Sequence, residues 1–165
     1  MSTRVVRGKD FKFYRDTEAY DPTGYFTSSV WSLVKNIKDV TRNLETALAD
    51  ASVRGSTYKQ QVGTMKDLSI DTQMVYDAYD DDLQAFENAF HLSENVPICV
   101  LDGDIETVGS RGIMLVAQVS KFQGNEALED VGLVDITFVP GYDPVNLPTR
   151  VVVNSPGVLT PVAEA

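Results

Sequence analysis

The stretch from Leu68 to Phe90, LSIDTQMVYDAYDDDLQAFENAF, is the part of the chain that decides the fold, because its hydrophobic period changes halfway along. In its first part, apolar and polar side chains alternate, as on a strand with one buried face. After a run of three aspartates, apolar side chains recur at the spacing of one helix face. We therefore predict a strand at 68–76 and an amphipathic helix at about 80–91, capped by Asp80 or Asp81.

Most of the remaining chain is predicted as strands joined by polar turns. The first strand region begins at Trp31, and the parity of its apolar residues changes near Lys38 and Asp39, which indicates a β-bulge. Later apolar runs predict strands at 95–101, 112–122 and 134–138. The region from Leu44 to Met65 has little pattern, so we expect a long functional loop there unless it forms a hairpin. The pattern as a whole predicts an antiparallel β-sandwich or barrel with one helix.

The chain of 165 residues divides into an N-terminal arm and loop (1–29), a β domain (30–141) and a C-terminal extension (142–165). The start is charged throughout and lacks the apolar core of a secretory signal. No apolar run reaches the length of a membrane span. The Pro-rich extension is expected to be ordered only if it docks on the domain.

Charge is unevenly distributed along the chain. From Met1 to Arg15 there are five basic residues and one acidic residue, a net charge of +4. From Asp77 to Asp130, 12 acidic residues stand against two basic ones, a net charge of −10. A basic arm on an acidic body is suited to binding a neighbouring copy of the same chain. Specific nucleic-acid binding is disfavoured, because an acidic body repels phosphate.

The sequence contains little reactive chemistry. Cys99 lies in an apolar strand and is predicted to be a buried thiol. The single histidine, His91, falls at the end of the predicted helix, where it suits a C-terminal position better than a general base. No nucleotide-binding, CxxC or HExxH motif is present. We therefore predict no catalytic residue, no metal site and no cofactor.

The order of these elements resembles the tail tube (major tail) proteins of long-tailed bacteriophages, a family related in fold to the tube of type VI secretion systems. The matching features are the opening strand region 31–41, the ADASVR motif at 49–54, the strand at 68–76, the helix at 80–90, the turn at 101–103 and the closing strand at 133–140. The resemblance covers residues 30–141.

This resemblance implies a structural virion protein, without enzymatic activity, that assembles into stacked hexameric rings forming the tail tube. Its partners would be further copies of itself, the tape measure protein, the tail terminator and the baseplate, and assembly would take place in the host cytoplasm. DNA would pass through the tube without specific binding, since an acidic bore does not hold phosphates. No membrane is involved.

The resemblance also implies roles for individual residues. The loop between early strands would stack on the adjacent ring through Asp50, Arg54 and Tyr58. The N-terminal arm would make contacts through Arg4, Arg7, Lys9 and Lys12. The polar parity of the strands places Asp39, Asp71 and Asp135 as candidates for the lumen.

Other classes of function stay open at this point. A capsid decoration protein or a host-attachment module would use the same β scaffold in a small fixed oligomer. A tail terminator or a secretion-system tube would share the fold. An enzyme would need paired acids such as Asp102 and Glu106. The symmetry number of a ring, and the strand face that lines it, are also open.

Overall fold

The computed structural model describes residues 5–18, 30–125, 128 and 131–162. In these residues the chain is mainly antiparallel β-sheet with one α-helix, which confirms the predicted fold class. A short 3₁₀ turn, Gly8–Asp10, comes first. The strands and the helix follow in the order β1 (Lys12–Asp16), β2 (Trp31–Leu33), β3 (Ile37–Asp50), β4 (Gln61–Val75), α1 (Asp81–Leu92), β5 (Asn95–Leu101), β6 (Arg111–Asn125), β7 (Leu133–Pro140), β8 (Thr149–Ser155) and β9 (Val158–Pro161).

Helix α1 begins directly after Asp80, as predicted. The Oδ1 atom of Asp80 accepts a hydrogen bond from the backbone N–H of Asp82 at 3.0 Å, which satisfies a donor that the first helical turn leaves unpaired. At the other end, Ser93 adopts the left-handed conformation with φ of 54°, and its N–H bonds to the carbonyl of Ala89. Both ends of the helix are therefore defined by local hydrogen bonds. The described part of the chain contains no helix with the length and hydrophobicity of a membrane span.

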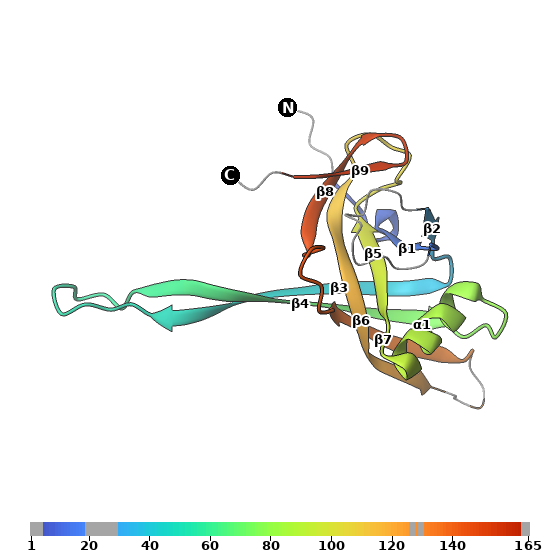
Figure 1. Ribbon diagram of the computed structural model, residues 1–165, viewed down its shortest axis with the longest axis horizontal. Coiled ribbons are helices and arrows are strands. Elements are labelled where there is room, and N and C mark those ends of the chain that lie inside the picture. Colours follow the sequence, from blue (N-terminus) through green and yellow to red (C-terminus); the bar gives the residue numbers. More distant parts are fainter. Residues whose placement is uncertain (1–4, 19–29, 126–127, 129–130, 163–165) are drawn as a thin grey trace.

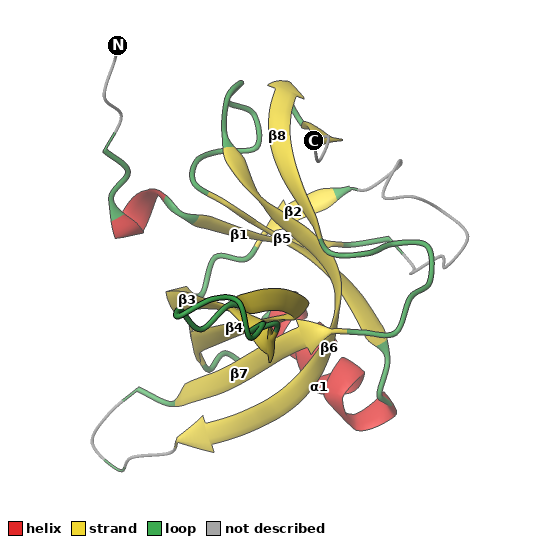
Figure 2. Cartoon of the chain, turned by 90° about the vertical axis from the view of Figure 1, so that its left-hand side faces the viewer, coloured by secondary structure: helices red, strands yellow, loops and turns green. Residues whose placement is uncertain are grey.

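The main sheet has the strand order β2-β1-β5-β6-β7-β4-β3 and curls back on itself. Phe13 on β1 and Phe138 on β7 are three strand spacings apart, roughly 14 Å in a flat sheet. Their ring centroids are nevertheless only 5.5 Å apart, and Phe86 of α1 packs against both rings. The helix closes one side of the curl (Figure 2). The first hydrophobic core fills the concave side.

A second hydrophobic core lies on the opposite face of β5 and β6, so these two strands are buried on both faces. Cys99, Leu101 and Met114 point into this core, and Val151 and Val153 of β8 cover it. The Oη atom of Tyr14 accepts a hydrogen bond from the backbone N–H of Ile105 at 3.0 Å and joins the connection after β5 to this core. Burial raises the pKa of the Tyr14 hydroxyl, which stays protonated and in place.

The region from Leu44 to Met65 is the outer part of a long β-hairpin, the alternative that the sequence left open. Strands β3 and β4 pair from Ile37–Met74 out to Asp50–Gln61, and the hairpin projects far from the body (Figure 1). We call residues 44–65 the arm. The bulge predicted near Lys38 and Asp39 is confirmed by a register shift between Ile37 and Asp39.

The two ends of the chain contribute strands to the sheet. Strand β1 lies in the segment expected as an N-terminal arm, yet it pairs with both β2 and β5, and its Phe13 and Tyr14 are buried on opposite faces. The basic residues around these two aromatics concealed the strand in the sequence. In the C-terminal segment, β8 pairs with β6 and β9 with β8, so the extension docks on the domain.

Candidate functional site

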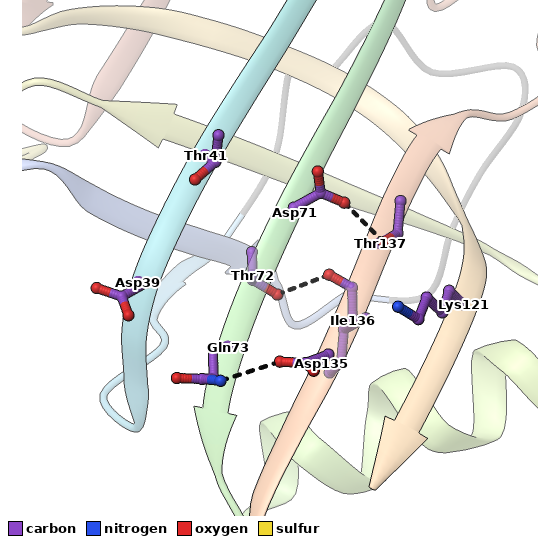
Figure 3. Close-up of a pocket in the computed structure, with 9 residues that line it drawn as sticks. All are labelled: Asp39, Thr41, Asp71, Thr72, Gln73, Lys121, Asp135, Ile136 and Thr137. Carbon is purple, nitrogen blue, oxygen red and sulfur yellow. Dashed lines mark hydrogen bonds between the residues drawn. The ribbon is translucent and has the colours of Figure 1, made fainter. Parts of the chain in front are cut away.

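The three acids predicted for the lumen lie on one face of the sheet, brought together by the strand register. Asp39 on β3 pairs with Gln73 on β4, which pairs with Asp135 on β7. One row further along, Thr41, Asp71 and Thr137 are aligned in the same way, with Lys121 of β6 beside Thr137. Figure 3 shows these side chains around a shallow hollow of about 400 Å³. We call this surface of β3, β4, β7 and β6 the polar face.

Hydrogen bonds across the strands hold the polar face in place. Thr137 Oγ1 donates to Asp71 Oδ1 at 2.7 Å, and Asn43 Nδ2 donates to Asp71 Oδ2 at 2.8 Å. Gln73 Nε2 donates to Asp135 Oδ1 at 3.1 Å (Figure 3). The carboxylates are therefore oriented by neutral donors, which leave their negative charge uncompensated.

The charge of the polar face is negative. Three carboxylates and one cation, Lys121, line the hollow. Asp39 and Asp71 are exposed, and no ion pair to either is present in the described residues. In the same residues no cluster of three metal-ligating side chains occurs. The face presents charge and hydrogen-bonding groups over a wide surface and has no enclosed pocket for a small substrate.

The polar face ends in two open strand edges. Strand β3 is the last strand on its side of the sheet, with β4 as its partner. On the other side, β5 pairs with β6 as far as Gln118, and from Val119 to Asn125 the described part of β6 pairs with β7 alone. An open edge presents unpaired N–H and C=O groups that another strand can satisfy.

The residues predicted to stack rings lie at the outer end of the arm. Asp50 ends β3, and its carboxylate accepts a hydrogen bond from the N–H of Ser52 at 2.9 Å. The hydrogen bonds from the Ser52 side chain and backbone lower the pKa of Asp50. Arg54 is exposed, and the Tyr58 side chain is 82% exposed. Their role in stacking remains a prediction.

The arm also carries exposed apolar side chains. None of the residues from Thr41 to Asp67 is buried. The large apolar side chains exposed on the arm are Leu44, Leu48, Val53, Tyr58, Val62 and Met65. A single copy leaves this apolar surface in water, which is typical of a surface that another protein covers.

Four basic residues near the N-terminus were predicted to contact neighbouring copies, and one of them, Arg4, lies outside the described residues. Arg7 and Lys9 are exposed at the 3₁₀ turn, and Lys12 is half-buried in β1. Arg15 was not among the predicted contact residues, and its Nε donates to Asp82 Oδ1 at 2.8 Å, which connects β1 to the start of the helix. The contacts of the four predicted residues remain a prediction.

The residues that the sequence offered as possible reactive groups are buried, hydrogen-bonded in a turn or exposed on the surface. Cys99 is fully buried, and burial strongly raises the pKa of its thiol, as expected for an inert core cysteine. Asp102 Oδ1 accepts a hydrogen bond from the N–H of Arg111 at 2.7 Å, across the turn between β5 and β6. His91 is exposed in the last turn of α1.

No protein-family model matches the sequence, and no curated protein matches it. Solved structures do match the fold. The SPP1 tail tube superposes with a TM-score of 0.69 at 11% identity, covering 93% of this chain and 82% of the other. This chain has the fold of a tail tube protein.

Two further solved structures share this fold. A chain from the tail of the empty gene transfer agent particle, refined with C6 symmetry, has a TM-score of 0.59 at 14% identity. The match covers 96% of this chain and 100% of the other. A chain of the six-fold symmetrised anti-feeding prophage baseplate has a TM-score of 0.59 at 10% identity, covering 93% of this chain and 99% of the other. The expected fold resemblance is confirmed, and at these identities the likeness concerns the fold.

Proposed function

We propose that this protein is a structural component of a viral tail, which assembles through copies of itself into stacked hexameric rings that form a tube for DNA. The observation that carries the proposal is the polar face with an open strand edge on each side. The tail-tube fold and the C6 symmetry of the gene transfer agent tail support it.

The strand directions suit a closed ring. Strands β3, β4, β7 and β6 alternate in direction, since each neighbouring pair is antiparallel. In a ring of copies related by rotation, the outer half of β6 from one copy would therefore run antiparallel to β3 of the next copy. This pairing satisfies both open edges and continues the sheet from copy to copy.

The dimensions also suit the passage of DNA. Six copies that each contribute four strands, about 4.8 Å apart, give a circumference of roughly 115 Å and a diameter near 37 Å between backbones. Strand tilt widens this further. With the polar face turned inward, Asp39, Asp71 and Asp135 line the bore and repel phosphates, so that the DNA is not held.

The proposed partners follow from the position in a tail. Copies of the same chain pair within and between rings, with Asp50, Arg54 and Tyr58 of the arm and Arg7 and Lys9 near the N-terminus as the proposed contact residues. The tape measure protein, the tail terminator and the baseplate would contact the inside and the two ends of the tube. The proposed location is the virion tail.

Negative-stain electron microscopy of the concentrated protein tests this proposal, with the expected result of rings and hollow tubes. A matched control removes residues 1–9 and keeps β1, because a longer truncation would delete the buried Phe13 and Tyr14. A protein that stays monomeric at every concentration, and is absent from tails, would contradict the proposal.

A charge-reversed bore provides a second test. The variant Asp39→Lys with Asp135→Lys should still form tubes, because neither carboxylate is buried. Those tubes should retain double-stranded DNA at low salt and release it as salt rises, whereas wild-type tubes should not retain it. DNA retention that is equal in both would argue against an inward polar face.

A further inference from the structure

A groove with an apolar floor and a basic rim lies beside the root of the arm. Its volume is about 1010 Å³, and its floor includes Phe11, Leu68 and Ile113. Four cations line it, one from each of four strands: Arg42 of β3, Lys66 of β4, Arg111 of β6 and Arg150 of β8. Asp102 is the acidic residue of the lining. We call this the basic groove, and its chemistry suits an acidic segment with an exposed apolar or aromatic side chain.

The opposite end of the sheet carries such a segment. Residues 76–81, which we call the acidic turn, run from the end of β4 to the first residue of α1 and begin with Tyr76. Tyr79 is 92% exposed and Tyr76 is 54% exposed, and Asp77 and Asp81 beside them are exposed as well. A tyrosine this exposed is a common anchor in protein interfaces.

The groove and the turn lie at different ends of the molecule. Strand β4 runs from the arm, past Lys66 at the groove, to Val75 at the acidic turn. Nine strand residues separate these two positions, roughly 30 Å. In Figure 1 the arm leaves the body on one side, and the turn between β4 and α1 lies at the far side. A copy therefore cannot fill its own groove with its own acidic turn.

We infer that, in the tube proposed above, the acidic turn of one copy docks in the basic groove of a copy in the adjacent ring. The two faces of a rotationally symmetric ring differ, so identical rings stack head to tail and need complementary surfaces at opposite ends. Tyr79 enters the apolar floor, and Asp77 and Asp81 pair with the cations of the rim. Arginine is well suited to this role, because its planar group stacks on aromatic rings and pairs with carboxylates.

Charge disfavours two other segments of the chain as the occupant of the basic groove. The tip of the arm, residues 51–60, carries Arg54 and Lys59 and no acid, so the cations of the groove repel it. The first four residues of the chain likewise contain a cation, Arg4, and no acid. The arm can then contact the adjacent ring elsewhere while the acidic turn fills the groove.

A charge swap tests this inference in the full-length protein. Asp77→Lys and Arg150→Asp should each shorten the tubes seen by negative-stain microscopy at least several-fold and leave free rings, and the double variant should recover at least half of the wild-type length. Glu106→Lys is the control, because this exposed residue lies outside both surfaces and should leave tube length unchanged.

Cross-linking provides a second readout, which does not depend on the effects of charge. The variant Tyr79→Cys with Leu147→Cys places one thiol in each surface, while the native Cys99 is buried and does not compete. Oxidised tubes should give a ladder of linked chains on a non-reducing gel, and Tyr79→Cys with Glu106→Cys should not.

The outcomes separate this inference from the proposed function. Wild-type protein that forms neither rings nor tubes would contradict both. A different set of results would overturn the docking alone: wild-type tubes together with single variants whose tubes keep the wild-type length, a double variant that is not rescued, or an absent ladder. The groove would then be assigned to another occupant, such as another tail protein.

Discussion

Strands β5 and β6 approach each other so closely at Gly112 that no side chain fits between them. A Cβ atom at this position would lie 2.7 Å from the carbonyl carbon of Val100 and 2.9 Å from Cα of Leu101. We predict that Gly112→Ala destabilises the monomer by about 3 kcal/mol or more, since backbone atoms must move apart. Urea unfolding measures this. Gly55→Ala, where nothing lies within 4 Å, is the control and should change stability by less than about 0.5 kcal/mol. Equal effects would contradict this packing.

Cys99 should be unreactive as long as the protein is folded. Burial raises the pKa of its thiol, so the protonated form persists through pH 8, and the reactive thiolate is absent. We predict that a thiol reagent such as DTNB modifies less than a tenth of the native protein in an hour at pH 8, and all of it in denaturant. Rapid modification of the native protein would show that the second core opens.

At the scale of single residues, the alternation of polar and apolar side chains predicted the orientation of strand residues well where one face of the strand is polar. Asp39, Asp71 and Asp135 were chosen because they alternate with apolar neighbours, and the register places them on one surface. The basic groove could not be found in this way, because Arg42, Lys66, Arg111 and Arg150 come from four strands. The strand predicted at 68–76 ends at Val75, and Tyr76 just beyond it is 54% exposed.

At the scale of elements, the helix is defined by its N-cap. Asp80 Oδ1 accepts a hydrogen bond from the backbone N–H of Asp82, and Asp80 Oδ2 accepts one from Asn36 Nδ2 at 2.7 Å. We predict that Asp80→Ala costs about 1–2 kcal/mol of stability, measured by urea unfolding, because both bonds are lost. Asp81→Ala, at an exposed neighbouring position, is the matched control and should cost clearly less. Equal losses would mean that the cap has no special weight.

The arm should be dispensable for folding and required for assembly. Thr46 and Lys66 are cross-strand partners, so Asn-Gly in place of residues 47–65 closes a short hairpin. We predict that the free energy of unfolding of this variant lies within about 1 kcal/mol of the wild-type value, because the deleted residues are not buried in the monomer. Sedimentation and electron microscopy should find no tubes. Tubes of normal length would exclude a role of the arm in assembly.

Sequence pattern identified the helix and the later strands well, since each has one clearly apolar face. It was weaker for the arm and for β1, for a physical reason. The arm is exposed on both faces in a single copy, so nothing in the monomer requires alternation between Leu44 and Met65. Strand β1 is too short for a period, and its two buried aromatics, Phe13 and Tyr14, serve two different cores.

At the scale of the whole molecule, several surfaces that a single copy leaves uncovered are explained by the same assembly. The open edges, the exposed apolar arm and the separation of the basic groove from the acidic turn all concern surfaces that the monomer does not cover. The domain division at residues 30 and 142 remains a prediction, although β1, β8 and β9 share the sheet with the central strands. In our account, the unit that is complete in hydrogen bonds is the ring of copies.

Cryo-electron microscopy of the assembled protein, at a resolution that separates strands, tests this account most directly. We predict that β3 of one copy hydrogen-bonds antiparallel to β6 of its neighbour between Val119 and Asn125, with Asp39, Asp71 and Asp135 facing the bore. A map in which β3 has no strand partner, or in which these three carboxylates face outward, would contradict it.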